Sequence, residues 1–348
     1  MNPHKIRWTE ETWNPTKGCS KVTRACMHCY AETMAGRIVQ MKTTGADHYE
    51  GTVKKMGDAW RWTGKVVFQY LWLTKPLRNK KPTVYFVNSM SDLFHEELSV
   101  EQIAAVFATM MECRNRHIFQ VLTKRPKRMQ ELLSSSEFIA EVCRQSRKLA
   151  SNGYIKTAFP MDVVRELFPL DNVWLGTSVG EEKDKHFIDY LRDTPAEVRF
   201  LSLEPLVGRI QPLFLDDIHW VILGGESGWA RTVKPLHPDY AEEIRNACLQ
   251  QGVPFFFKQW GRWMPWKVLP DGTFINVNGV AHKNPLPDNL ELAVANGQWN
   301  DGMEFTNKGC TDYVFQSTSK DKSGNLLDGK VYEAFPQQLY DWTKKHGL

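Results

Sequence analysis

The stretch HWVILGGES, residues 219–227, shows the pattern that decides the fold. Its first part is almost continuously apolar, which is typical of a parallel strand that is buried on both faces. A short polar segment follows at once and marks the end of the strand. The same apolar character recurs in six further runs, which are KVVFQ (65–69), PTVYFVNS (82–89), HIFQVLT (117–123), NVWLGTSV (172–179), VRFLSLE (198–204) and VPFFFKQW (253–260).

Amphipathic segments between these runs predict helices. Ser99 and Gln102 have the spacing of a capping box, and Pro238 and Gly252 bracket a second helix-like segment. Strands that alternate with helices predict an α/β protein with a parallel sheet. Two architectures fit, a full or partial (β/α) TIM-like barrel and an open doubly wound sheet. We favour the barrel because it would gather the polar segments after its strands on one rim, although an open sheet would also gather them at one edge.

The domain organisation follows from where this pattern stops. Residues 1–263 are predicted to form the barrel, with insertions near 40–64 and 134–170. Residues 264–348 are rich in turn signals such as DGT and VNG, which suggest hairpins. We expect them to form an irregular C-terminal extension that packs against the barrel.

Composition is that of a globular protein. The chain has 348 residues, of which 42% are hydrophobic and 24% are charged, and its formal net charge is +4. No apolar run reaches the length of a membrane span, so we expect no membrane association and a cytoplasmic location. Thiols stay reduced in the cytoplasm, so the seven cysteines favour metal or catalytic use over a disulfide framework.

Three of these cysteines lie within eleven residues, in the segment WNPTKGCSKVTRACMHCYAE (13–32). Cys19, Cys26 and Cys29 follow the predicted first strand and precede a helix-like run. Thiolates at this spacing repel one another unless a cation neutralises them, so the three cysteines are predicted metal ligands. A structural zinc site needs a fourth ligand, for which His28 is the nearest candidate. An iron–sulfur cluster held by three cysteines would instead leave one iron open, and we favour that interpretation.

At these residues the sequence resembles a phage-associated three-cysteine-motif family, a family with a domain of unknown function that is grouped with the radical SAM enzymes. The resemblance rests on Trp13 to Cys19 and Cys26 to Glu32, and on further motifs along the chain. These motifs are LTKRP (122–126), WLGTSV (174–179), LEPL (203–206), GGESG (224–228), FKQWG (257–261) and LLDG (326–329).

The resemblance implies a [4Fe-4S] cluster on Cys19, Cys26 and Cys29, with S-adenosylmethionine bound to the open iron. Reductive cleavage of that cofactor would give a 5'-deoxyadenosyl radical that acts on a substrate. An external electron donor such as a flavodoxin or a ferredoxin would supply the electron. The chain departs from most radical SAM enzymes in one respect, because six residues rather than three separate Cys19 from Cys26.

The polar segments after the strands supply candidate ligands for S-adenosylmethionine and the substrate. Ser89, Ser91 and Asp92 are candidate acceptors for its ammonium group, and its ribose hydroxyls are expected to meet Thr177, Ser178 or Glu204. Glu226 in GGES resembles the Gly-Gly-Glu motif that binds the amino group in many radical SAM enzymes. Its late position in the chain makes a substrate contact as good a role. Glu204 and Glu226 are therefore the candidate catalytic residues.

Basic and aromatic residues bear on the substrate. Lys124, Arg125, Lys127 and Arg128 lie at a strand end and the first turn of a helix, where backbone N–H groups favour anions. Lys258 and Trp260 follow another strand in the pattern of surfaces that bind phosphate and stack bases. DNA or RNA is thus the predicted partner, and repair or modification of a base or nucleotide is the predicted activity. The alternative is a zinc-stabilised DNA-binding or partner-binding phage protein without catalysis.

Overall fold

The computed structural model describes residues 6–41, 46–229, 232–269, 271, 273–283, 292–294, 313–318 and 320–348. Within this part of the chain, seven parallel strands form one sheet in the order β1-β6-β7-β8-β9-β10-β11. The strands are β1 (Glu11–Trp13), β6 (Thr83–Val87), β7 (His117–Thr123), β8 (Val173–Ser178), β9 (Val198–Leu203), β10 (Trp220–Gly224) and β11 (Phe255–Gln259).

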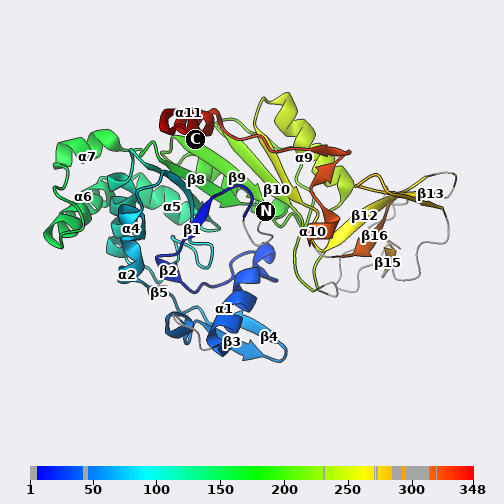
Figure 1. Cartoon of the computed structure of the whole chain (residues 1–348), viewed down its shortest axis with the longest axis horizontal. Coiled ribbons are helices and arrows are strands. Elements are labelled where there is room, and N and C mark those ends of the chain that lie inside the picture. Colours follow the sequence, from blue (N-terminus) through cyan, green and yellow to red (C-terminus); the bar gives the residue numbers. More distant parts are fainter. Residues whose placement is uncertain are drawn as a thin grey trace.

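The strand order decides between the two predicted architectures. Spatial order follows chain order throughout, whereas a doubly wound sheet reverses its direction at a switch point. β1 and β11 lie at opposite ends of the sheet, so the strands form a half-barrel (Figure 1). The expectation of a partial TIM-like barrel is confirmed.

One predicted strand was wrong. The run at 65–69 contains β5 (Val67–Phe68), which pairs with β2 (Thr16–Lys17) outside the main sheet. The first position in the half-barrel belongs to β1, a segment of only three residues.

Helices cover the outer face of the half-barrel. They include α4 (Val100–Glu112), α5 (Pro126–Leu133), α6 (Ser136–Ser151), α7 (Met161–Leu167), α8 (Phe187–Arg192) and α9 (Pro238–Gln250), and α4 to α7 gather on one side of the sheet in Figure 1. The capping box that begins α4 is present, since Ser99 accepts from the Gln102 amide and Gln102 accepts from the Ser99 amide. Residues 134–170, expected to be an insertion, supply α6 and α7, and apolar side chains of both join the outer core. None of the helices in the described ranges has the length and apolar character needed to cross a membrane.

Aromatic side chains fill the inner face. Alternate residues of β6 to β11 point there, and they pack with Trp8 into a second core. This core contains Phe86, Trp174, Phe200, Trp220 and Phe256. Helix α11 (Gln337–His346) packs on this core through Leu339 and Trp342.

Two smaller units flank the half-barrel. Helix α1 (Tyr30–Met41) packs with η2 (Ala46–Tyr49) and the hairpin of β3 (Val53–Met56) and β4 (Ala59–Trp62). The C-terminal extension contains an antiparallel sheet in the order β14-β13-β12-β16-β15, where an irregular segment was expected. Its strands are β12 (Trp263–Val268), β13 (Thr273–Asn276), β14 (Ala281–Lys283), β15 (Leu292–Val294) and β16 (Tyr313–Ser317). The remaining described elements are η1 (Arg24–Cys26), α2 (Tyr70–Leu73), α3 (Lys75–Arg78), η3 (Glu182–Asp184), α10 (Lys320–Ser323), β17 (Leu326–Leu327) and β18 (Lys330–Val331).

We predict that Gly176→Ala destabilises the inner face. A Cβ atom at Gly176 would lie 2.5 Å from the Phe200 ring, so the ring must move and the free energy of unfolding should fall by about 1–3 kcal/mol. Urea denaturation measures the change. In the double variant with Phe200→Leu the smaller side chain makes room, so the combined loss should be less than the sum of the two single losses. Strictly additive losses would contradict this packing.

Candidate functional site

A polar layer lies on the inner face, at the carboxyl ends of the strands above the aromatic core. We call it the inner polar layer, and it consists of Ser178, Ser202, Glu204 and Lys258. Strand alternation puts Ser178 and Ser202 two residues beyond the level of the Phe200 ring, and the two serines are paired neighbours of β8 and β9. Lys258 Nζ donates to Glu204 Oε1 at 2.6 Å. Ser178 is 2% exposed, and its hydroxyl oxygen has no hydrogen-bond partner in the described structure.

The cysteine loop, residues 19–29, lies over these strand ends. It follows β2 and contacts segments that come much later in the chain. A Cβ atom at Gly180, just after β8, would lie 2.9 Å from the Ala25 Cβ. His28 Nδ1 lies 2.9 Å from Oε1 of Glu226, which follows β10 and is buried. The fold thus brings the three cysteines to the rim where the inner polar layer is located.

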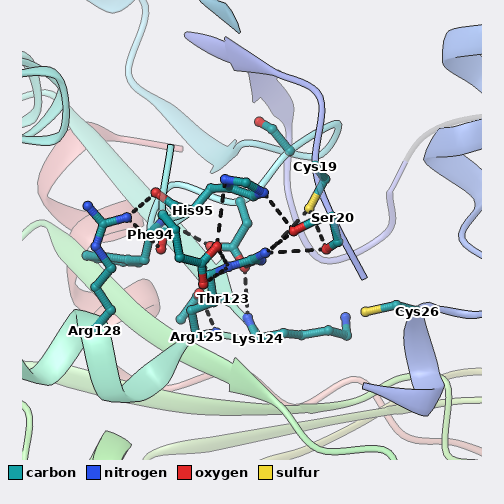
Figure 2. A network of polar contacts seen from close by, with 12 residues as sticks. Cys19, Ser20, Cys26, Phe94, His95, Thr123, Lys124, Arg125 and Arg128 are labelled. Carbon is teal, nitrogen blue, oxygen red and sulfur yellow. Dashed lines mark hydrogen bonds and ion pairs between the residues drawn. The ribbon is translucent and has the colours of Figure 1, made fainter. Parts of the chain in front are cut away.

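A buried arginine ties the cysteine loop to β6 and β7 (Figure 2). Arg125 is 6% exposed and its Nε lies 2.8 Å from both carboxylate oxygens of Glu96. Its Nη1 donates to Asp92 Oδ2 at 3.2 Å, and its Nη2 donates to the Ser20 hydroxyl at 2.7 Å. His95 Nε2 lies 2.8 Å from the same hydroxyl. The loop residue Ser20 is therefore held by two side chains from beyond the ends of different strands.

Neighbouring charges set the protonation of Arg125 and His95, the two side chains that hold Ser20. Burial alone would lower the pKa of the guanidinium, but Asp92 and the Cys19 thiol raise it, so Arg125 is a permanent cation. Burial lowers the pKa of His95, and Arg125 lowers it further. His95 Nδ1 accepts from the Glu97 amide at 3.2 Å, which leaves Nε2–H to donate to Ser20.

The three thiols have unequal electrostatic surroundings. Burial and then Asp92 raise the pKa of Cys19 to about 12, against the opposing effect of Arg125. Burial also raises the pKa of Cys29. Burial opposes ionisation of Cys26 too, but Lys124 and backbone hydrogen bonds outweigh it and lower the pKa. Figure 2 shows the Lys124 side chain extended toward the Cys26 sulfur.

The residue types of this donor set are those that bind metal clusters. All three cysteines are free thiols, and Cys26 and Cys29 each raise the pKa of Cys19, so the sulfurs are electrostatic neighbours. A bound cation would remove that repulsion. In the described residues, no three His, Cys, Asp or Glu side chains are arranged in a metal-holding geometry. The residues are thus brought near one another without a formed coordination site.

The predicted ligands of S-adenosylmethionine fall into two sets. Ser178 and Glu204 belong to the inner polar layer. The other four make hydrogen bonds within the protein: Ser89 to Asn14, Ser91 to Thr16, Asp92 to Thr123 and Arg125, and Thr177 to the Thr123 carbonyl. Glu226 is likewise engaged, with His28 and the Lys234 amide. Their ligand-binding roles stay predictions.

The predicted nucleic-acid contacts also differ in their placement. Arg125 is internal, and Arg128 donates to the backbone carbonyls of Phe94, His95 and Leu98, which it ties together beyond β6. Trp260 is buried and donates to the Leu326 carbonyl. Lys258 is paired with Glu204. Lys127 is exposed and Lys124 is half-buried beside Cys26.

Sequence patterns did not indicate two connections of the site. The His28–Glu226 contact joins two motifs, but nothing in either motif says which residue is the partner of the other. Lys17, which precedes Gly18, is buried with its ammonium 4.7 Å from the Tyr49 ring centre and 5.1 Å from that of Trp72. The sequence-based prediction of a turn at NPTKG was wrong here, because Thr16–Lys17 form β2; only Gly18, with φ of +90°, adopts a conformation that favours glycine.

A comparison with protein-family models assigns the chain to a family. A family model described as a protein of unknown function (DUF5131) matches residues 3–336. The chain belongs to this family. The match spans the half-barrel, the cysteine loop and most of the C-terminal extension, so the family and the described fold cover the same segment. The searches against curated proteins and against solved structures returned no match.

We predict that Arg125→Met destabilises the protein strongly. The substitution leaves the buried carboxylate of Asp92 without its cation, which typically costs about 3–5 kcal/mol in the free energy of unfolding. Urea denaturation measures this loss. Lys127→Met, two residues away on an exposed position, serves as the control and should change stability by no more than about 0.5 kcal/mol. Equal stability of the two variants would contradict this structural role of Arg125.

We also predict the order in which the thiols react in metal-free protein. At pH 8 a lowered pKa means a larger thiolate fraction, so iodoacetamide should modify Cys26 before Cys19. Peptide mass spectrometry at short times measures the order. Lys124→Gln removes the cation that lowers the pKa of Cys26 and should slow its modification. Modification of Cys19 first would contradict this electrostatic picture.

Proposed function

We propose that the protein is an iron–sulfur enzyme of the radical SAM type that acts on a nucleic-acid base or a nucleotide. The observation that carries the proposal is the position of Cys19, Cys26 and Cys29. They are free thiols on a single loop, and that loop lies over the carboxyl ends of a half-barrel, where barrel enzymes perform their chemistry. The likeness of the motifs to the phage-associated three-cysteine family supports the same proposal.

The cysteines would hold a [4Fe-4S] cluster with one open iron. When bound, that group would supply the reductive cleavage of S-adenosylmethionine to a 5'-deoxyadenosyl radical. The protein provides the charge balance, because Lys124 is a cation beside Cys26 and Arg125 is a cation beside Cys19. Arg125 and His95 also fix the backbone of the loop through Ser20, so the first cysteine has a defined position.

The inner polar layer would bind the reacting molecules. The unpaired hydroxyl of Ser178 and the carboxylate of Glu204 are polar groups on the inner face beneath the cysteine loop. The aromatic core that begins with Phe200 closes the space below them and excludes water from that side. An apolar core below a site protects a reactive intermediate from solvent.

A nucleotide or nucleic-acid substrate is supported by two cations at the rim. Lys127 is exposed, with its ammonium 3.9 Å from Glu131, and the Lys124 side chain points toward the Cys26 sulfur (Figure 2). The Arg125 and Arg128 side chains support this binding indirectly, because they hold the segment that carries both lysines. The likeness to a phage-associated family favours DNA or RNA over a small metabolite.

Metal analysis after anaerobic purification tests the proposal. We expect about four iron and about four sulfide ions per chain, and loss of iron in each of Cys19→Ala, Cys26→Ala and Cys29→Ala. Cys113→Ala and Cys248→Ala are the controls, since both side chains are buried in the outer core and should retain the iron. About one zinc per chain, or full iron in all three variants, would overturn the ligand assignment and favour the zinc-stabilised binding protein.

Turnover of S-adenosylmethionine tests the activity itself. Dithionite-reduced protein should slowly form 5'-deoxyadenosine and methionine even without substrate, and liquid chromatography with mass spectrometry detects both. The three cysteine variants should form neither. If iron is present but the cofactor is neither bound nor cleaved, the activity is refuted while the cluster remains.

A further inference from the structure

Asn88 is a buried residue whose side-chain amide has no hydrogen-bond partner. It follows β6 directly and is 4% exposed, and within the described residues neither its Nδ2 nor its Oδ1 atom is bonded. A buried amide without partners has lost its hydrogen bonds to water and gained none in the protein, which destabilises the folded state. A bound ligand that completes these bonds would remove that cost.

The backbone of Asn88 has a conformation that few residues adopt. Its φ is +62°, in the left-handed region, where asparagine is tolerated better than most residues and glycine best of all. Its backbone N–H donates to the Trp13 carbonyl of β1 at 2.8 Å, and its carbonyl accepts from the Ser91 amide at 3.3 Å. The main chain is therefore fixed on both sides, whereas the side-chain amide that it carries is unpaired.

Asn88 extends the inner polar layer to β6. Val84 and Phe86 of β6 point into the inner core, and Asn88 is the next alternate residue along the chain. Ser178 of β8 shares the property of Asn88, because it is 2% exposed and its hydroxyl has no partner in the described structure. Two unpaired polar side chains thus lie at strand ends of the same face, with only β7 between the two strands.

Tyr30, the first residue of α1, adds an aromatic ring to this region. Its hydroxyl donates to the Ser89 carbonyl at 2.7 Å, so the ring is fixed beside the residue that follows Asn88. Burial raises the pKa of this hydroxyl, and the nearby charges of Cys29 and Glu204 raise it further. Tyr30 nevertheless exposes 53% of its surface. An accessible ring with a desolvated hydroxyl is typical of the wall of a concave site.

The chemistry of these three side chains fits the base of a nucleotide. An asparagine amide offers one donor and one acceptor side by side, and it can bind the edge of a base through two hydrogen bonds. The Ser178 hydroxyl can donate or accept, so it suits a further atom of that edge. Aromatic rings stack on the flat faces of bases.

We propose that Asn88 recognises the edge of the substrate's base, with Ser178 as a second polar contact and the Tyr30 ring as the stacking surface. This inference rests on the proposed function and deepens it, because it assigns recognition of the base to named residues. Since the Asn88 amide is buried, a ligand that leaves it unpaired is rejected more strongly than at an exposed site.

Equilibrium dialysis of the full-length protein with AMP, CMP, GMP and UMP tests the site, and ribose 5-phosphate, which lacks a base, is the reference probe. At least one nucleotide should bind at least about tenfold more tightly than ribose 5-phosphate. Asn88→Gly removes the amide and permits the same φ, so it should lower the affinity for that nucleotide to the level of ribose 5-phosphate. Ser178→Ala should weaken binding, and Tyr30→Leu should weaken it about tenfold, whereas Tyr30→Phe keeps the ring and should retain most of the affinity.

Stability separates a ligand-binding role of Asn88 from a structural one. Without ligand, Asn88→Gly should unfold at the same urea concentration as the parent or at a higher one, because it removes an unpaired buried amide and relieves the left-handed backbone. Asp217→Gly is the matched control. Asp217 also has a left-handed φ, +59°, but it precedes β10 at the opposite end of the sheet, so nucleotide affinity should not change.

Three results would overturn the inference: no nucleotide binding by the parent, equal nucleotide affinity of parent and Asn88→Gly, or a lowered urea midpoint of Asn88→Gly, which would make the amide a structural group. An Asn88→Gly variant that loses affinity for S-adenosylmethionine but for no nucleotide would also overturn it, because the site would then belong to the cofactor. Cleavage of S-adenosylmethionine without nucleotide binding would refute this site and leave the proposed activity standing. Nucleotide binding that depends on Asn88, without cleavage, would refute the activity and leave the site.

Discussion

The guanidinium of Arg125 is the charge on which the arrangement of the site depends. It is buried, it faces Asp92 and Glu96, and it reaches across to Ser20 on the cysteine loop. A buried cation is stabilised when its donors are hydrogen-bonded, and the donors of Arg125 bind two segments that are distant in sequence, the one after β6 and the cysteine loop. The loop has little secondary structure of its own beyond η1, so these contacts supply much of its order.

Polar side chains at the strand ends differ between the two faces of the half-barrel. On the outer face, polar side chains at the strand ends have partners within the protein: the Thr177 hydroxyl donates to the Thr123 carbonyl, and the Thr123 hydroxyl donates to Asp92. On the inner face, the next residue along the same strand, Ser178, has a hydroxyl without a partner. Thr177 and Ser178 are neighbours on β8 and point to opposite faces, so the first has a structural role and the second is a candidate ligand of a bound molecule.

Sequence patterns predicted the parallel sheet, the position of the cysteine loop after the first strand, and the capping box at Ser99. Continuous apolar runs and short-range spacings report on local structure, and these features depend on little else. The patterns could not separate Thr177 from Ser178, because the register of a strand relative to the inner face is set by its neighbours. They also could not show that Arg125 faces Asp92, since a cluster of cations has the same sequence whether its partners are carboxylates of the chain or phosphates. The run at 65–69 misled for a related reason: its apolar character was real, but its partner strand was the two-residue β2.

The contact between His28 and Glu226 also has a consequence for how the protein is made. The two residues are 198 positions apart, and a ribosome that adds about 5–20 residues per second needs about 10–40 s to synthesise the chain between them. During that interval the cysteine loop has left the ribosome without the residue that later pairs with His28. The cysteine loop therefore makes its final contacts only after β10 has been synthesised.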